Sequence, residues 1–493
     1  MIPAPQRRAA GAVLLAALFF AIAAYQIDRP GLQADELLFV QGVWEGGTVA
    51  LETRVFGHRV PLMQLAYLGS LKSILYKPIL AAFGVSAAAV RLPMVAVAAA
   101  TVALTFLLLW RMAGERAAWM GGTLLALDPT FMFTTRCDWG PVAIERFLAV
   151  AGLMCFERRR INLGAFLFGL ALWNKTTFLW TLIGLAVAVA AAYRRELRAR
   201  LAWRGAGLAL LCFALGAYPW IRYNVRTSGG TAAATARFDA SDLKGKLHLL
   251  RSSLEGSSLF GYLVREDDGR PWPRAGILPW LLGIAVFWAL GSRDRLGLFF
   301  VTLLGASWLA MALTRGAGGS AHHVVLIWPW PHCLLALAGS HWPRRFSIAL
   351  VLAAALNAGV IARHYALLEK AGANPPWSEA VYDMTKEVLA QQPAGVFVND
   401  WGIVEPLLFA SRGKLRMELS TDPARAVEDL AARPGWIFVS HTDALQEFPN
   451  VNARWKRPLR GYRRVQVMPP VRDRQRVPVY EVFRFEPLPR TTR

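Results

Sequence analysis

Long apolar runs separated by short polar loops fill residues 1–363 of the chain. A transmembrane helix needs about 20 mainly apolar residues to cross a hydrocarbon core of about 30 Å. Such runs lie at about residues 9–27, 92–110, 117–133, 139–156, 161–173, 176–193, 201–221, 275–291, 296–313, 322–339 and 346–362. The fifth and sixth runs are predicted as two helices that meet at Asn174–Lys175, because one helix of 33 residues would be about 50 Å long. The pattern predicts a polytopic α-helical membrane protein with about eleven transmembrane helices.

Basic residues in the short loops predict the orientation, because Lys and Arg are retained on the cytoplasmic side. With the N-terminus inside, the cytoplasmic loops carry sixteen arginines, whereas the opposite short loops carry Arg136, Lys175 and Arg315. The sixteen are Arg7, Arg8, Arg111, Arg116, Arg158, Arg159, Arg160, Arg194, Arg195, Arg198, Arg200, Arg204, Arg293, Arg295, Arg344 and Arg345. We therefore expect a multi-pass protein of the cytoplasmic (inner) membrane, with a cytoplasmic N-terminus, an extracytoplasmic C-terminus and two long outer loops, residues 28–91 and 222–274.

The first apolar run has a second interpretation. Arg7–Arg8, an apolar core and the small residues near Ala21–Ala24 also fit a cleaved signal peptide. The run is long for a signal peptide, and a retained helix would hold the polar residues that follow it at the membrane surface. We therefore favour a retained helix.

From about residue 364 onward the pattern changes to that of a small α/β domain. Strand-like segments lie at 395–400, 414–419 and 435–441, and helix-like segments lie at about 402–410 and 422–432. Strand-like VQVM and VPVYEVFRF follow. The sequence thus predicts a membrane domain, residues 1–363, and an extracytoplasmic α/β domain, residues 364–493, on the outer face.

Composition and charge agree with a membrane protein. The 493 residues include 55% hydrophobic and only 18% charged residues, and the net charge is +22. The basic residues form short clusters between apolar runs, as in cytoplasmic membrane loops, so nucleic acid is not expected as a partner. The four cysteines form no CxxC pair and lie mostly in apolar segments, which indicates packing residues rather than a disulfide framework or a zinc site.

Ionisable residues gather at the predicted outer ends of the helices. Because burying a charged side chain there costs free energy, such residues usually have a function. They are Asp35, Glu36, Asp128, Arg136, Asp138, Glu145, Lys175, His322 and His323. Together they supply carboxylates, cations and imidazoles. Glycosyl transfer needs a carboxylate that takes the proton of the acceptor and a cation near the leaving phosphate. The set of residues suits that chemistry.

Several of these segments resemble the polyprenyl-phosphate-sugar-dependent glycosyltransferases of the GT-C superfamily. That superfamily includes the protein O-mannosyltransferases of glycosyltransferase family 39 and the lipid A aminoarabinose transferases. Asp35–Glu36, GHRVPLMQLAYLGSLKSILYKPILAAFG (57–84) and VRLPMVAVAAATVALTFLL (90–108) are similar to the family's first outer loop and second helix. LLALDPTFMFTTRCDWGP (124–141), FGLALWNKTTFLW (168–180) and HHVVLIWPWPHCLLALAG (322–339) are similar to later family segments. The resemblance covers most of residues 1–340 as a series of individually weak motifs.

The resemblance implies a role for each candidate residue. Asp35 would be the general base, with Glu36 beside it, and Asp138 would complete the catalytic site. Lys175 would bind the donor phosphate, together with Arg136, His322 and His323. A divalent metal ion is left open as a cofactor, with Asp35 and Asp138 as its ligands. The spacing of Arg136 and Asp138 is shorter than usual in the family, so Asp128 or Glu145 could take the role of Asp138.

Ordinary structural roles compete with these functional ones. Asp35–Glu36 could cap a helix that starts at Leu37, and Lys175 could extend from a helix end to the interface. Asp128 is interpreted as a helix-end residue before Pro129, and Glu145–Arg146 as residues that pair with other charges inside the bundle. His322–His323 could simply end a helix.

The function predicted from the sequence is that of an inverting hexosyl or pentosyl transferase. Its donor would be a polyprenyl-phosphate sugar, its environment membrane lipid, and its acceptor a glycan, lipid or protein that the sequence does not identify. A carrier or flippase for lipid-linked saccharide is one alternative, although such a protein usually places its charges near the bilayer midplane. A ligase that uses a diphosphate-linked oligosaccharide is another, since it shares the architecture.

Overall fold

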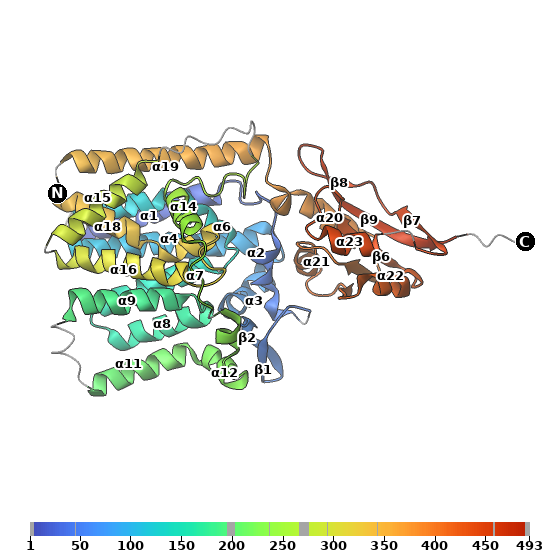
Figure 1. Cartoon of the computed structure of the whole chain (residues 1–493), viewed down its shortest axis with the longest axis horizontal. Coiled ribbons are helices and arrows are strands. Elements are labelled where there is room, and N and C mark those ends of the chain that lie inside the picture. Colours follow the sequence, from blue (N-terminus) through green and yellow to red (C-terminus); the bar gives the residue numbers. More distant parts are fainter. Residues whose placement is uncertain are drawn as a thin grey trace, which may run out of the picture.

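The computed structural model describes residues 4–44, 46–194, 203–235, 237–265, 276–292, 294–342, 344–456 and 459–488. Arg195, Arg198, Arg200 and Arg293, which contribute to the predicted orientation, lie outside these residues. Figure 1 shows a bundle of helices at one end of the molecule and a smaller unit with a sheet at the other. The first outer loop lies between them.

Each apolar run predicted from the sequence is mainly helical within the described residues, with short breaks in several of them. The helices are α1 (Ala4–Ala24), α4 (Ala87–Ala113), α5 (Glu115–Ala126), α6 (Pro129–Cys137), α7 (Val142–Glu157), α8 (Ile161–Asn174), α9 (Phe178–Ala192), α11 (Trp203–Gly216), α12 (Tyr218–Arg226), α15 (Leu278–Gly291), α16 (Arg295–Ala312), α17 (Ala321–Val324), η2 (Val325–Ile327), α18 (Trp330–His341) and α19 (Arg344–Lys370). Helix α1 packs against α4, with Leu15, Phe19 and Ala23 buried in the bundle core. The prediction of a polytopic helical membrane protein is therefore confirmed.

The number of spans stays a prediction. Within the described residues, four helices are long and apolar enough to cross a membrane alone, and three sharply bent pairs raise the number to seven if each pair is one span. Helices α8, α9 and α15 are shorter apolar helices. Length and composition alone therefore do not establish all eleven spans.

The predicted third span at 117–133 is two helices in the structure. Helix α5 ends at Ala126 and α6 begins at Pro129, with Asp128 as its N-cap. The Asp128 carboxylate accepts a hydrogen bond from the backbone N–H of Phe131 at 2.6 Å. The break has a local cause, because a proline is well suited to the first turn of a helix and the residue before it avoids the helical region.

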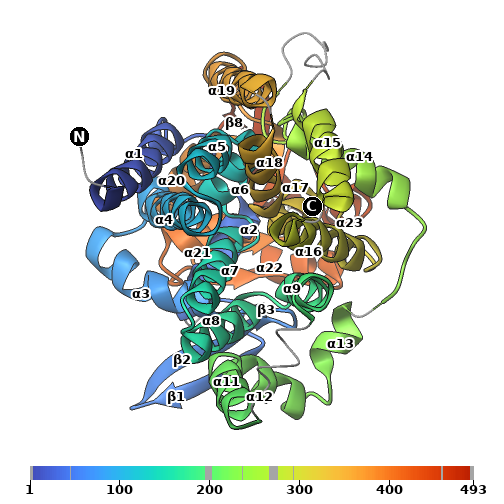
Figure 2. The same cartoon turned by 90° about the vertical axis from the view of Figure 1, so that its left-hand side faces the viewer.

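The first outer loop is folded rather than irregular. It contains α2 (Ala34–Leu38), η1 (Gln41–Val43), α3 (Leu71–Phe83) and an antiparallel sheet of order β1-β2-β3. The strands are β1 (Leu51–Val55), β2 (His58–Leu65) and β3 (Leu68–Gly69). The second outer loop contributes α13 (Gly230–Thr235) and α14 (Leu243–Leu254). Figure 2 shows the molecule end-on, from the side of the bundle that lies away from the C-terminal unit. The β1–β2 hairpin and α11–α13 lie at the periphery of the bundle.

The C-terminal unit has the predicted α/β character. Its elements are η3 (Pro375–Trp377), α20 (Ala380–Ala390), β4 (Gly395–Val398), α21 (Val404–Ala410), β5 (Met417–Glu418), α22 (Pro423–Ala431), β6 (Trp436–His441), α23 (Pro449–Trp455), β7 (Tyr462–Gln466), β8 (Val471–Arg472) and β9 (Pro478–Pro487). The sheet has the order β5-β4-β6-β9-β7, and β8 also pairs with β9. Strand β4 runs parallel to β5 and β6, whereas β9 is antiparallel to its neighbours. Separate hydrophobic clusters involve Val396 and Phe397, which point to opposite faces of β4.

The two units meet through α21. This helix packs against α2 and η1 of the first outer loop. The ring of Phe409 lies 5.7 Å from that of Trp44, and Phe409 belongs to the core of the bundle. The predicted domain boundary after residue 363 falls inside α19, which continues to Lys370. The division into two domains stays a prediction.

Candidate functional site

Asp35 lies in the first turn of α2, between the bundle and the C-terminal unit (Figure 1). The cap of this helix is Gln33, whose side chain accepts a hydrogen bond from the Asp35 backbone N–H at 2.8 Å. The Asp35 carboxylate is therefore not needed as a cap, and it has no hydrogen-bond partner among the described residues. Burial raises the pKa of Asp35, and the positive charge of Lys175 acts in the opposite direction. A desolvated carboxyl with a raised pKa is suited to act as a general base.

Glu36, the neighbour of Asp35, has a different environment. The Arg91 guanidinium donates to both of its carboxylate oxygens, at 2.7 Å and 2.8 Å, and both side chains are fully buried. Arg91 also donates to the backbone oxygens of Ile27, Pro30 and Gly31. This network anchors the start of the first outer loop to α4. Both carboxylate oxygens of Glu36 therefore already accept hydrogen bonds from Arg91. The ion pair supports the segment that carries Asp35.

Lys175 lies in the short connection between α8 and α9, as the sequence predicts. An isolated bridge pairs it with Leu68, and its ammonium donates to the backbone oxygen of Gly140 at 2.8 Å. Burial lowers the pKa of Lys175 to about 8, although the nearby carboxylates of Glu145, Asp138 and Asp35 oppose the shift. A buried cation whose protein partner is a neutral carbonyl remains available to an anionic group of a ligand.

His322 and His323 lie on α17 beside this connection. The His322 ring accepts from or donates to the Ser320 hydroxyl at 2.7 Å, and the two imidazole rings are 4.3 Å apart. A Cβ atom added to Gly140 would lie 2.7 Å from the His322 ring and 3.2 Å from the Lys175 nitrogen. Gly140 therefore lies against both the imidazole and the ammonium, and a larger residue would not fit there without a shift of the His322 ring.

Two tyrosines that the sequence did not single out lie near enough to Asp35 for its negative charge to act on them. Burial, followed by the negative charge of Asp35, raises the pKa of Tyr67 and raises that of Tyr262 to about 12. Tyr67 lies between β2 and β3, and its backbone oxygen accepts from Thr176, next to Lys175. Tyr262 packs its ring against Trp139 and Trp377. No sequence motif marks these tyrosines, because only the folding of the outer loops brings them to Asp35.

Asp138 is held by another residue that the sequence did not single out. The Lys72 ammonium lies 2.7 Å from the Asp138 carboxylate, and both side chains are about 1% exposed. The second carboxylate oxygen accepts from the backbone N–H of Ala143 at 2.9 Å. These contacts fix the turn between α6 and α7.

A divalent ion does not fit this donor set. Within the described parts of the chain, no three His, Cys, Asp or Glu side chains gather as metal ligands. Asp138, one of the two ligands suggested by the sequence, already receives an ammonium and a backbone N–H. A metal would have to displace Lys72, so we assign no step to it.

Arg136 lies away from Lys175. Its guanidinium donates to the backbone oxygens of Ala23 and Tyr25 at 2.6 Å, and also to those of Gln26 and Arg29. It donates further to the Tyr365 hydroxyl at 2.8 Å. These carbonyls belong to the end of α1 and the loop after it, so Arg136 holds that segment in place. The structure does not bring Arg136 together with Lys175 and the two histidines.

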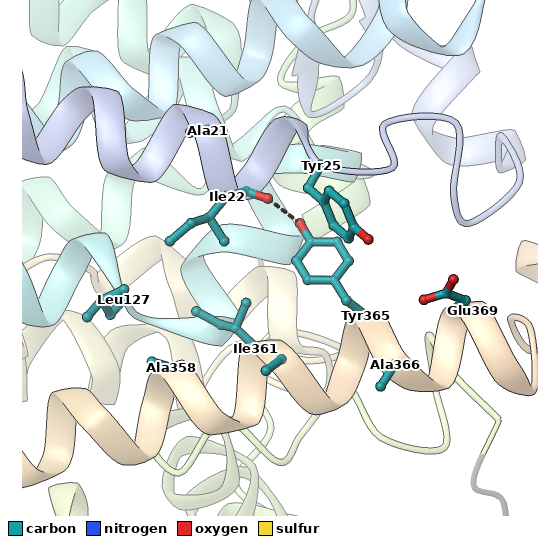
Figure 3. A pocket seen from close by; sticks show the side chains of 10 residues that line it. Ala21, Ile22, Tyr25, Leu127, Ala358, Ile361, Tyr365, Ala366 and Glu369 are labelled. Atoms are coloured by element: carbon teal, nitrogen blue, oxygen red, sulfur yellow. Dashed lines mark hydrogen bonds between the residues drawn. The ribbon is translucent and has the colours of Figure 1, made fainter.

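A groove of about 630 Å³ lies next to this arginine, between α1 and α19. Figure 3 shows its largely apolar wall, with the Tyr365 hydroxyl bonded to the backbone oxygen of Ile22 at 2.7 Å. Tyr25 and Glu369 mark its outer end. None of the residues proposed from the sequence lines it, so the groove is separate from the surroundings of Asp35.

Asp128 and Glu145 have the structural surroundings favoured from the sequence. Asp128 accepts hydrogen bonds from Trp328 at 2.9 Å and pairs with the His332 ring at 3.0 Å, in addition to capping α6. Glu145 forms a buried ion pair with Arg146 at 2.6 Å. The Asp128 carboxylate thus connects α6 to η2 and α18, whereas the pair of Glu145 and Arg146 lies within α7.

The helical bundle, the folded first outer loop and the C-terminal sheet together have a fold similar to that of solved GT-C glycosyltransferases. Similar solved structures are those of ArnT from Cupriavidus metallidurans, bound to undecaprenyl phosphate and in the apo state. Both have a TM-score of 0.64 over 96% of this chain and 97% of ArnT, with 13% and 14% identity. An oligosaccharyltransferase from Archaeoglobus fulgidus, tethered to an acceptor peptide, has a TM-score of 0.53 and 10% identity, over 90% of this chain and 70% of that one.

The resemblance seen in the sequence is thus confirmed for the fold. No protein-family model and no curated protein sequence matches the chain. The fold likeness at this identity says nothing about the individual site residues, whose roles stay predictions.

Proposed function

We propose that the chain is an inverting glycosyltransferase that moves one sugar from a polyprenyl-phosphate donor to an acceptor on the outer face of the cytoplasmic membrane. The observation that carries the proposal is the position of Asp35. Its carboxylate lacks a protein hydrogen-bond partner among the described residues, and it is near enough to the buried ammonium of Lys175 for the positive charge to oppose the rise in its pKa. The bridge between Leu68 and Lys175 brings the cation to the first outer loop, which also carries the base.

Each of these groups has a task in such a transfer. Asp35 takes the proton of the attacking acceptor group, while Lys175 stabilises the negative charge that develops on the leaving phosphate. His322 and His323 lie beside Lys175 and are candidates for further contact with the phosphate. Glu36 and Arg136 support the loop that carries Asp35. Attack on the face opposite to the leaving phosphate would invert the anomeric centre.

The GT-C fold supports this proposal, and the ArnT structure with undecaprenyl phosphate supports a polyprenyl phosphate as the lipid of the donor. The alternatives are a carrier of lipid-linked saccharide and a ligase with a diphosphate-linked oligosaccharide as its donor. The position of the ionisable groups at the outer helix ends favours the transferase over the carrier. The orientation with the N-terminus inside is part of the proposal.

The test is to purify the protein in mild detergent and to identify its lipids by mass spectrometry. We expect a polyprenyl phosphate or its monosaccharide derivative. The isolated glycosyl lipid, added back to native membranes that contain the protein, should be converted to polyprenyl phosphate. A diphosphate-linked oligosaccharide in the purified sample would favour the ligase, and binding of a glycosyl lipid without turnover would favour the carrier.

A further inference from the structure

Helix α14 of the second outer loop and the first half of α15 enclose a groove of about 520 Å³. Figure 2 shows the two helices side by side at the edge of the bundle. Apolar residues of both helices line the floor of the groove, and Lys244, His248 and Arg251 of α14 line it with polar groups. None of the candidate site residues is among its lining residues, so the groove is separate from the surroundings of Asp35.

Both ends of α14 are fixed to the bundle. The buried ammonium of Lys246 donates to the backbone oxygens of Ala312 at 2.6 Å and Thr314 at 3.2 Å, at the end of α16. Near the other end of α14, the backbone oxygen of Ser253 accepts from the Thr130 hydroxyl at 2.7 Å. The groove between α14 and α15 is therefore formed by the protein alone.

The groove runs from the membrane surface into the hydrocarbon region. Trp280, in the first turn of α15, is 67% exposed, and tryptophan is typical of the interface between membrane and water. The lining residues continue along α15 to Val286, over about 10 Å of helix. A Cβ atom added to Gly283 would have no neighbour within 4 Å, so the groove is open at this depth. This space can accommodate part of a hydrocarbon chain.

The polar groups of the groove lie at its outer end and are basic. Lys244, His248 and Arg251 share one face of α14, because residues three or four positions apart in a helix are neighbours. Lys244 and His248 are exposed and have no side-chain partner in the part of the chain that the structure describes. The Arg251 guanidinium donates to Glu255 at 2.8 Å and lies 5.7 Å from the centre of the Trp280 ring.

The acids of this helix are engaged elsewhere. Asp242 caps α14 by accepting from the backbone N–H of Gly245 at 3.1 Å, and Glu255 holds Arg251. None of the described lining residues is acidic. An ammonium and an imidazole thus remain free for an anionic group at the outer end of an apolar groove.

We propose that this groove binds an anionic phospholipid of the surrounding membrane. Its phosphate accepts hydrogen bonds from Lys244 and His248, and one acyl chain lies on the apolar floor beside Gly283. A zwitterionic phospholipid offers the same phosphate, but the positive charge of its headgroup is repelled by Lys244. The inference does not depend on the proposed glycosyl transfer, because the groove contains none of the candidate site residues.

The test titrates the delipidated full-length protein in detergent with phosphatidylglycerol or with phosphatidylcholine of identical chains. Native mass spectrometry gives the dissociation constant of the first lipid bound. We expect tighter binding of phosphatidylglycerol. The double variant Lys244→Gln/His248→Gln should bind it about tenfold more weakly, because charge-assisted hydrogen bonds are lost. Equal affinity for the two lipids would refute the proposal.

A matched control removes one lysine and one histidine that are also exposed, in the first outer loop. This variant, Lys77→Gln/His58→Gln, should bind phosphatidylglycerol like the wild type. An equal loss of binding in both double variants would show a general effect of surface charge and overturn the assignment to the groove. Unchanged binding in Lys244→Gln/His248→Gln would do the same.

The seat of the acyl chain is tested with Gly283→Leu, which fills the open part of the groove without a clash. We expect weaker binding of phosphatidylglycerol in this variant. Gly305→Leu on α16 is the control, since a Cβ atom there also meets nothing within 4 Å. Wild-type binding by Gly283→Leu would exclude the groove as the seat of the chain. Displacement of phosphatidylglycerol by a lower concentration of undecaprenyl phosphate would assign the groove to a polyprenyl lipid and refute the phospholipid.

Discussion

Arg91 holds Glu36 by two hydrogen bonds of 2.7 Å and 2.8 Å in a fully buried ion pair. The same guanidinium binds three backbone oxygens of the segment before α2. The carboxylate of Asp35, the preceding residue in sequence, has no hydrogen-bond partner in the described structure, and the charge of Lys175 opposes the rise in its pKa that burial causes. The two adjacent acids therefore have different roles. Glu36 anchors the loop, and the carboxylate of Asp35 is available to act as a base.

Replacing Asp35 by Asn should abolish transfer without unfolding the protein. Removal of a general base costs about 10²-fold to 10⁴-fold in rate. Because burial raises the pKa of Asp35, the ionised form opposes folding once the pH exceeds that pKa, and the neutral amide removes this penalty. We expect an equal or higher melting temperature near neutral pH in detergent, measured alongside donor turnover. Transfer at the wild-type rate would exclude Asp35 as the base.

The rate of transfer should depend on pH through Asp35 and Lys175. Protonation inactivates the base as the pH falls through the raised pKa of Asp35, so the acidic limb should lie above the usual range of an aspartate. Loss of the Lys175 charge should lower the rate as the pH rises through about 8. In Lys175→Arg the charge persists, so the alkaline limb should move beyond the range measured. An unchanged alkaline limb in this variant would assign that limb to another group.

Substitution of Glu36 by Gln should mainly destabilise the protein. Breaking a buried ion pair from one side costs about 3–5 kcal/mol, because the remaining charge is buried without compensation. We expect a clearly lower melting temperature for Glu36→Gln and a smaller loss for the double variant with Arg91→Met. Turnover per folded molecule should fall much less than in Asp35→Asn. The opposite result, lost turnover at unchanged melting temperature, would support the catalytic role suggested by the sequence.

Lys72 and Asp138 should behave as one structural unit. Each single variant, Asp138→Asn or Lys72→Met, removes one partner of a contact of 2.7 Å between two side chains that are about 1% exposed. The effects of the two substitutions on the melting temperature should therefore be less than additive in the double variant. A catalytic Asp138 would instead give lost transfer in Asp138→Asn with an unaffected Lys72→Met variant.

The local patterns of the chain were sufficient for its secondary structure. The apolar runs correspond to helices, and the strand-like segments near 395–400 and 435–441 correspond to β4 and β6. The predicted span 117–133 runs across the break between α5 and α6, although the signal of a helix end, Asp128 before Pro129, was recognised in the sequence and Asp128 is the N-cap of α6. The continuous apolar character of 117–133 outweighed that signal.

The sequence by itself determined the membrane character, the helical segments, the α/β nature of the C-terminal unit and the acidic pair at residues 35 and 36. Hydrophobic periodicity acts over a few residues, so these features can be predicted locally. Only the tertiary structure decided which acid is paired and which is free. Glu36 is paired with Arg91 and Asp138 with Lys72, whereas the Asp35 carboxylate has no hydrogen-bond partner in the described part of the chain. A buried charge takes its properties from the groups packed around it, and packing brings those groups together from distant parts of the chain.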